Sequence, residues 1–118
     1  MSEDILLVED DAAIRESLAE CLALEGHTVR AAAEGAEALG WLAAGNRPRV
    51  VVVDLVMPGM SGEEFLDRLR AAPGPQRVPV VLMTAVSPGK VALPSADAML
   101  HKPFELDEFL GVVARFLR

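Results

Sequence analysis

The sequence has few of the residues that mark a secreted or membrane-bound protein. It contains one cysteine, Cys21, so no disulfide can form within the chain, and a reducing cytoplasm is the expected location. Its longest apolar runs, such as Ile5–Val8 and Val50–Val53, are far too short to span a bilayer. The acidic N-terminus, residues 1–4, does not have the pattern of a signal peptide. These features predict a cytoplasmic domain with no membrane partner.

Positive charge is also scarce. Eleven Lys and Arg residues stand against 18 Asp and Glu residues, which gives a formal net charge of −7. This excess of negative charge disfavours nucleic acid as a partner and suits a cation or a protein with a basic patch. With 118 residues, of which 52% are hydrophobic, the chain has the size and composition of one globular domain, residues 1–118.

Short apolar runs alternate with longer stretches of helical spacing. The runs predict five strands, at residues 5–8, 28–33, 50–53, 78–83 and 96–100. Four β-branched residues in a row, Val50–Val53, make the third strand the clearest. Such alternation predicts an α/β fold with a doubly wound, flavodoxin-like parallel sheet of strand order 2-1-3-4-5 and helices on both faces.

Capping residues and apolar stripes locate the helices. Asp11 stands where an N-cap would, and Ser61 with Glu64 has the spacing of a capping box. Two buried stripes at helical spacing are predicted, one in the first helix (Ile14, Leu18, Cys21, Leu22) and one in the last (Leu106, Phe109, Leu110, Val113, Phe116, Leu117).

Charged and polar residues stand at the predicted carboxyl ends of the strands. Glu9 and Asp10 follow the first strand, Asp54 the third and Thr84 the fourth, while Lys102 follows the fifth. In this sheet order the three carboxylates should converge, and they would repel one another unless a cation joined them. Oxygen ligands without nearby His or Cys favour Mg²⁺ over zinc or copper. The sequence therefore predicts a magnesium site at this edge.

The same residues suit phosphoryl chemistry. A carboxylate can attack phosphorus to give an acyl phosphate, and Asp54, held by the four valines before it, is the candidate nucleophile. Lys102 and Thr84 would supply a positive charge and a hydroxyl donor to the phosphoryl oxygens. For the metal, Asp10 is expected to ligate directly and Glu9 through a water, with the backbone carbonyl of Val56 completing the protein's ligands.

Four short motifs in this order resemble the motif set of the response-regulator receiver domain of two-component signalling, the CheY-like family: Glu9-Asp10, Asp54–Gly62, Thr84-Ala85 and Lys102-Pro103-Phe104. The resemblance extends from Ile5 to Leu117. It implies that Asp54 accepts a phosphoryl group from the phosphohistidine of a sensor histidine kinase or phosphotransfer protein. It also implies a Mg²⁺ cofactor, and a cis peptide bond before Pro103.

By the same resemblance, Thr84 and Lys102 would couple the phosphoryl group to a change in a surface that binds a downstream protein. Two departures affect that surface. Only 17 residues separate Thr84 from Lys102, and they include Pro88, Gly89 and Pro94, so the fourth helix should be shortened or missing. Met99 replaces the family's switch aromatic. We expect residues 86–95 to form at most one turn of helix, to be mobile, and to support weak dimerisation or none.

Three other functions compete with a phospho-accepting receiver. One is a degenerate receiver that binds proteins without phosphate. A second is a Mg²⁺-dependent phosphohydrolase with an aspartyl-phosphate intermediate, which would need an acid where Val56 stands. A third is a flavin-binding carrier, whose phosphate would be repelled by the acidic residues 9–11. A receiver is not expected to be an enzyme beyond its own phosphotransfer and slow autodephosphorylation, which the apolar Val56 should slow further.

Overall fold

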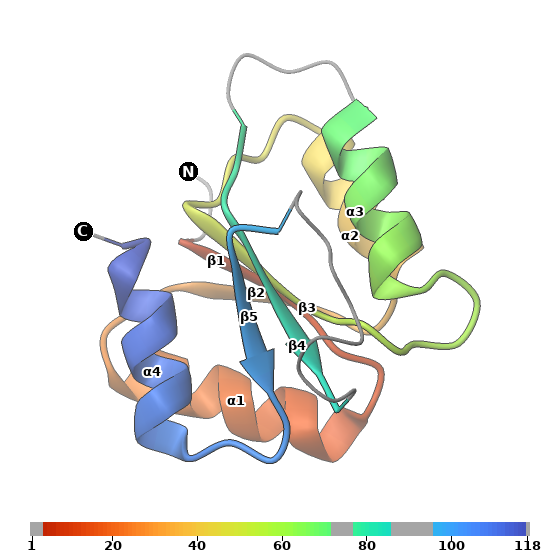
Figure 1. Ribbon diagram of the computed structural model, residues 1–118. Helices are drawn as coiled ribbons and strands as arrows, with labels where there is room; N and C mark the ends of the chain where they lie inside the picture. The colour runs from red at the N-terminus through yellow and green to blue at the C-terminus, as the bar shows by residue number, and fades with distance from the viewer. Residues whose placement is uncertain (1–3, 72–76, 86–95, 118) are drawn as a thin grey trace.

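The computed structural model describes residues 4–71, 77–85 and 96–117, which form alternating strands and helices (Figure 1). In chain order these are β1 (Ile5–Val8), α1 (Ala12–Leu24), β2 (Val29–Ala32), α2 (Gly35–Ala43), β3 (Val50–Asp54), α3 (Gly62–Ala71), β4 (Val80–Thr84), β5 (Ala98–His101) and α4 (Leu106–Arg115).

The five strands form one sheet in the order β2-β1-β3-β4-β5, and all neighbouring pairs are parallel. β3 is the central strand, with Val53 in register with Val8 of β1 and with Leu82 of β4. The predicted flavodoxin-like doubly wound sheet of order 2-1-3-4-5 is confirmed. Because parallel strands end at the same edge, the residues that follow β1, β3, β4 and β5 meet there.

Helices cover both faces of the sheet, α1 and α4 on one side and α2 and α3 on the other (Figure 1). Side chains alternate between the two cores along β3: Val51 and Val53 pack with Phe65 of α3, whereas Val50 and Val52 pack with Phe109 of α4. Every valine of this strand is fully buried, because both faces are covered. The acceptor candidate Asp54 therefore ends a strand fixed by packing on two sides.

The predicted helix caps are confirmed. The Asp11 Oδ1 atom accepts a hydrogen bond from the backbone N–H of Ile14 at 3.0 Å, and Ser61 Oγ accepts one from the N–H of Glu64 at 3.1 Å. Each bond satisfies one of the amide groups that the start of a helix leaves without a partner. Asp11 thus fixes where α1 begins, directly after the acidic residues Glu9 and Asp10.

Several element boundaries differ from those predicted. The second strand is shorter, Val29–Ala32, while the fourth and fifth begin later and extend further, to Thr84 and His101. Pairing with the neighbouring strand, rather than the apolar run, sets these limits: β4 begins at the pair Val51↔Val80, and β5 ends at the pair Thr84↔His101. The last strand, β5, therefore ends directly before Lys102.

The apolar stripes were right for the helix interiors and wrong at their first turns. Ile14 is 40% exposed and Leu106 is 45% exposed, because these first turns stand at the sheet's carboxyl edge, where the core ends. Cys21 is partly buried. The last helix ends at Arg115, but Phe116 and Leu117 still pack against the same core.

The segment predicted to lack a full helix, residues 86–95, lies outside the described residues, so that prediction stands as made. Met99 is partly buried and packs against the core between the sheet and helices α2 and α3. Among the residues that the structure describes, no helix is long and apolar enough to cross a membrane.

Candidate functional site

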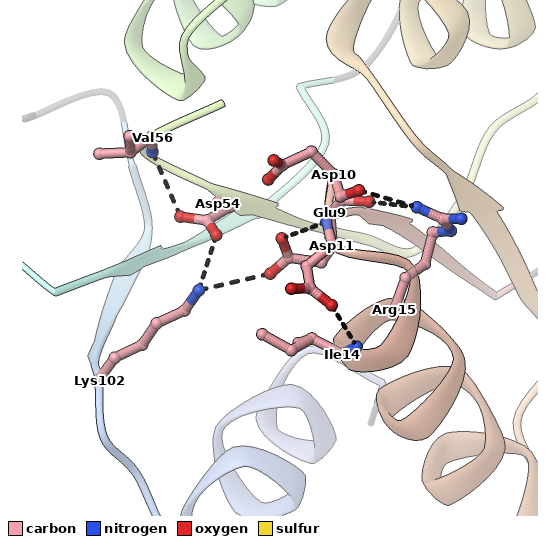
Figure 2. Close-up of polar contacts among 8 residues, drawn as sticks. All are labelled: Glu9, Asp10, Asp11, Ile14, Arg15, Asp54, Val56 and Lys102. Carbon is pink, nitrogen blue, oxygen red and sulfur yellow. Dashed lines mark hydrogen bonds and ion pairs between the residues drawn. The ribbon is translucent and has the colours of Figure 1, made fainter. Parts of the chain in front are cut away.

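The polar residues predicted at the strand ends lie at one edge of the sheet. Glu9 follows β1, Asp54 ends β3 and Lys102 follows β5, and their side chains point toward one another (Figure 2). The pair Val8↔Val53 places Glu9 and Asp54 at matching positions of adjacent strands. The sheet order thus brings together residues that are 45 and 48 positions apart in the chain.

Glu9, Asp10 and Asp54 form a compact carboxylate cluster. One carboxylate oxygen from each lies within 4.8 Å of the other two. Glu9 and Asp54 are buried, with 1% and 7% of their surface exposed, whereas Asp10 is open to solvent. Hard oxygen donors at this spacing suit a Mg²⁺ ion, which typically keeps several waters and binds one or two carboxylates of the protein directly. The exposed Asp10 leaves a side open for those waters.

Lys102 is paired with two of these carboxylates. Its Nζ atom donates a hydrogen bond to Asp54 Oδ2 at 2.7 Å and to Glu9 Oε1 at 3.4 Å. Burial alone would lower the pKa of the Lys102 ammonium, but the bond to Asp54 and the charges of Asp54 and Glu9 outweigh burial and raise that pKa. Lys102 therefore brings a fixed positive charge to the acceptor candidate.

The surroundings of Glu9 also shift the pKa of its carboxyl group. Burial raises the pKa of Glu9 from 4.5 to about 7, and the negative charge of Asp54 adds to the rise. The backbone N–H of Asp11, which donates to Glu9 Oε2 at 3.1 Å, acts in the opposite direction. A divalent cation among the three carboxylates would favour the ionised form of Glu9.

Asp54 is held from both sides. Its Oδ1 accepts a hydrogen bond from the Val56 N–H at 3.2 Å, and its Oδ2 accepts the one from Lys102. The Val56 side chain points away from these contacts and is 68% exposed (Figure 2). The structure thus places the Val56 amide at the acceptor candidate Asp54, while the predicted metal contact of the Val56 carbonyl stays a prediction.

The start of α3 is packed against the backbone of the acceptor candidate Asp54. A Cβ atom on Gly62 would collide with the Asp54 carbonyl oxygen and lie 2.7 Å from Leu55 Cα. Gly62 also donates its N–H to the Leu55 carbonyl at 2.8 Å. Only glycine fits so close an approach, so Gly62 fixes the path of the chain just after Asp54.

Thr84 is fully buried at the end of β4. Its neighbour Met83 is the register partner of Asp54, and the Thr84 carbonyl accepts the N–H of Lys102 at 2.7 Å. This bond ties the two residues predicted to contact phosphoryl oxygens to each other. What the Thr84 hydroxyl does remains a prediction. The Lys102–Pro103 peptide bond is cis, as expected.

One contact at this site was missed by the sequence argument. Arg15, in the first turn of α1, donates from Nη1 to the carbonyl of Glu9 at 2.9 Å and to that of Asp10 at 3.4 Å (Figure 2). The sequence did hold a signal: a basic residue only four positions after the N-cap Asp11 is unexpected, because the positive end of the helix dipole lies at this end of the helix.

Comparisons with known proteins agree with this geometry. Residues 5–114 match the family described as response regulator receiver domain. The chain is 42% identical to the response regulator MprA of Mycobacterium sp. (strain KMS) over 118 residues, which cover 97% of this chain and 50% of that protein. It thus spans about half the length of the curated relatives it matches.

Solved structures of similar sequence have the same fold. The chemotaxis response regulator CheY4 of Vibrio cholerae matches with a TM-score of 0.84 and 30% identity, over 98% of this chain and 99% of that one. The response regulator TrrA of Thermotoga maritima, in complex with Mg²⁺-BeF, matches with a TM-score of 0.82 and 34% identity, over 95% and 96% of the two chains.

TrrA has also been solved in complex with the histidine kinase ThkA. That match has a TM-score of 0.83 and 34% identity, and it covers 97% of each chain. The carboxylate cluster and its lysine at the end of a 2-1-3-4-5 sheet, together with these similarities, identify the chain as a member of the response regulator receiver domain family.

Proposed function

We propose that Asp54 is the phosphoryl acceptor of this receiver domain. The observation that carries the proposal is the pairing of Asp54 with Lys102 at 2.7 Å, at the end of the central strand and within the carboxylate cluster. A buried carboxylate beside a fixed cation is held ready for attack at an electrophilic phosphorus. Its second oxygen is held by the Val56 amide, which fixes the orientation of the group.

The proposed reaction is a transfer from nitrogen to oxygen. A carboxylate oxygen of Asp54 forms a bond to the phosphorus of a phosphohistidine, and the P–N bond of the donor breaks with its electron pair left on the imidazole. The product is an acyl phosphate. Lys102 then pairs with phosphoryl oxygens, because the esterified oxygen of Asp54 no longer carries the negative charge that held the ammonium.

Asp10 and Asp54 are the proposed side-chain ligands of Mg²⁺, with Glu9 acting through a water and the Val56 carbonyl as a backbone ligand. When bound, this ion supplies positive charge to the developing phosphoryl oxygens. Support comes from the spacing of the three carboxylates and from TrrA, which was solved with Mg²⁺-BeF. Thr84 is proposed to donate its hydroxyl to a phosphoryl oxygen and to couple occupancy of the site to a change in the domain surface.

The proposed phosphoryl donor is a sensor histidine kinase or a phosphotransfer protein. TrrA in complex with the kinase ThkA supports this choice. A downstream protein is the proposed reader of the altered surface, in the cytoplasm. Since the chain spans half of its MprA relatives, this proposal concerns the receiver domain and the events at its own site.

A phosphohydrolase acting on a separate substrate is a weaker alternative. Such an enzyme needs a general acid beside its acyl phosphate, and the position two residues after Asp54 holds the apolar, exposed side chain of Val56. We therefore propose no enzymatic activity beyond phosphotransfer to Asp54 and slow hydrolysis of the product. A degenerate receiver is disfavoured because acceptor, lysine and carboxylate cluster are all present and in contact.

Intact-mass spectrometry after incubation with acetyl phosphate tests the proposal. The parent protein is expected to gain the mass of one phosphoryl group with Mg²⁺ and not in EDTA. Asp54→Asn keeps the size and hydrogen-bonding shape of the side chain but cannot form an acyl phosphate, so it should gain nothing. A full gain in Asp54→Asn would refute the assignment, and no gain in the parent would favour the degenerate receiver.

A further inference from the structure

We propose that Arg15 is a positioning residue for the metal-binding end of the site. Its guanidinium holds two consecutive backbone carbonyls, those of Glu9 and Asp10, and thereby sets where the carboxylates of these residues lie. The inference rests on the proposed function, because it concerns the Mg²⁺ site of that function. Arg15 itself is neither the proposed acceptor, nor the lysine, nor one of the proposed metal ligands.

The first support is the backbone that leaves β1. The Glu9 N–H still bonds to the Ala32 carbonyl of the neighbouring strand at 3.1 Å, and the ladder between β1 and β2 ends one residue earlier, at Val8↔Ala32. The Glu9 and Asp10 carbonyls lie beyond that ladder. Arg15 extends back from α1, and its Nη1 atom donates hydrogen bonds to both carbonyls, at 2.9 and 3.4 Å (Figure 2). The guanidinium thus donates the hydrogen bonds that a neighbouring strand would donate to these carbonyls inside the sheet.

The second support is the arrangement on the other side of the same turn. The Asp11 N–H donates to Glu9 Oε2, and Asp11 Oδ1 in turn caps α1. The carboxylate of Glu9 is therefore tied to the turn through one amide, while Arg15 holds the carbonyls of that turn. With both in place, the turn has little freedom to rotate Glu9 or Asp10 away from Asp54.

The third support is the positive charge of Arg15 at the start of a helix. A cation is disfavoured in the first turn of a helix, and α3 and α4 carry acidic residues there, whereas α1 carries Arg15 and no acid. A positive charge near the cluster also opposes a second cation. Charge alone therefore predicts that loss of Arg15 strengthens Mg²⁺ binding, while positioning predicts that it weakens binding. The two explanations have opposite signs.

The test uses the full 118-residue chain and Mg²⁺ alone, titrated by isothermal calorimetry. Arg15→Met keeps the length of the side chain and removes its donors, and we expect the Kd for Mg²⁺ to rise about tenfold, as is typical when a partner of a metal ligand is lost. Arg30→Met is the matched control: Arg30 is exposed on the edge strand β2, so the same change in net charge should leave the Kd unchanged or slightly lower.

A second readout needs no metal. In EDTA, amide hydrogen exchange of residues 9–12 should be faster in Arg15→Met than in the parent, with the amides of β3 and β4 unchanged. If Arg15→Met does not fold, Arg15→Gln replaces it, because the shorter neutral side chain also lacks the guanidinium and its reach.

A folded Arg15 variant that binds Mg²⁺ as tightly as the parent, or more tightly, overturns the inference. Failure of the proposed function looks different: the parent itself would then bind no Mg²⁺ or accept no phosphoryl group. A parent that binds Mg²⁺ and is phosphorylated, beside an Arg15→Met variant with the parent's Kd, would refute the role of Arg15 alone.

Discussion

Lys102 Nζ lies 2.7 Å from Asp54 Oδ2, so the carboxylate of the proposed acceptor is in direct contact with a positive charge. The same ammonium lies 3.4 Å from Glu9 Oε1. Lys102 thus neutralises part of the carboxylate cluster, and its ammonium would compete there with a divalent cation. The pair connects the central strand of the sheet to the end of its last strand.

Lys102→Met should affect binding and reaction in opposite directions. Without the ammonium, Mg²⁺ meets less competition and should bind more tightly, while phosphorylation by acetyl phosphate at saturating Mg²⁺ should slow by about two orders of magnitude, as on removal of one charge-stabilising donor. Calorimetry and intact-mass time courses measure the two effects. Equal phosphorylation rates in variant and parent would contradict the role given to Lys102.

Gly62→Ala should disturb the site through a steric clash alone. The added Cβ would collide with the Asp54 carbonyl and with Leu55, so we expect a loss of about 1–3 kcal/mol in the free energy of unfolding and slower phosphorylation. Gly40→Ala is the matched control, because Gly40 lies inside helix α2 with open space around it. That change should stabilise the protein by about 0.5–1 kcal/mol. Denaturant unfolding measures the free energy of unfolding of both variants. A Gly62→Ala protein as stable as the parent would refute the close packing.

Val56→Asn should shorten the lifetime of the acyl phosphate. Val56 has an exposed side chain and lies two residues after the proposed acceptor Asp54, where an amide can orient the attacking water and an apolar side chain cannot. We expect hydrolysis to be about tenfold faster, less than the roughly hundredfold of a general base, because an amide orients the water but takes no proton. Val56→Ala, still apolar, serves as the control. Decay of phosphorylated protein followed by mass spectrometry decides, and an unchanged or slower decay in Val56→Asn would contradict the prediction.

Mg²⁺ binding should release a proton near neutral pH. In the metal-free protein the pKa of Glu9 is raised to about 7, so Glu9 holds a proton below that pH and must lose it when the cation binds. Because the pKa is raised on folding, protonation of Glu9 stabilises the metal-free fold fully below pH 4.5, and this contribution is lost as the pH rises through about 7.

Calorimetric Mg²⁺ titrations in buffers of different ionisation enthalpy count the protons released. Release should approach one proton at about pH 6 and vanish well above pH 7. The affinity for Mg²⁺ should fall correspondingly as the pH is lowered. Glu9→Gln has no proton to lose at this position, so its proton count should be near zero throughout. Equal counts in parent and variant would show that Glu9 is not the titrating group.

Much of the fold could be predicted because it depends on local patterns. The run Val50–Val53 marks a strand covered on both faces, and the position of Asp54 at its end follows from the sequence alone. Parallel topology then brings Glu9 and Lys102 to the same edge. Capping by Asp11 and Ser61 was equally local and was confirmed.

The features that could not be predicted from the sequence depend on tertiary packing. The bonds from Arg15 to two carbonyls and the close approach of Gly62 to the backbone of Asp54 arise only when strand and helix are packed together. The exposure of Ile14 and Leu106 likewise depends on where the core ends, which helical spacing does not encode. Residues 86–95, predicted to lack a full helix, lie outside the described part of the chain.

The most direct test of the central claim locates the phosphoryl group in the chain. Borohydride reduction of the phosphorylated protein converts an aspartyl phosphate to homoserine, and peptide sequencing by tandem mass spectrometry then identifies its position. The account predicts homoserine at position 54, formed only after treatment with acetyl phosphate and Mg²⁺. Homoserine at position 10 or elsewhere, with Asp54 recovered intact, would contradict it.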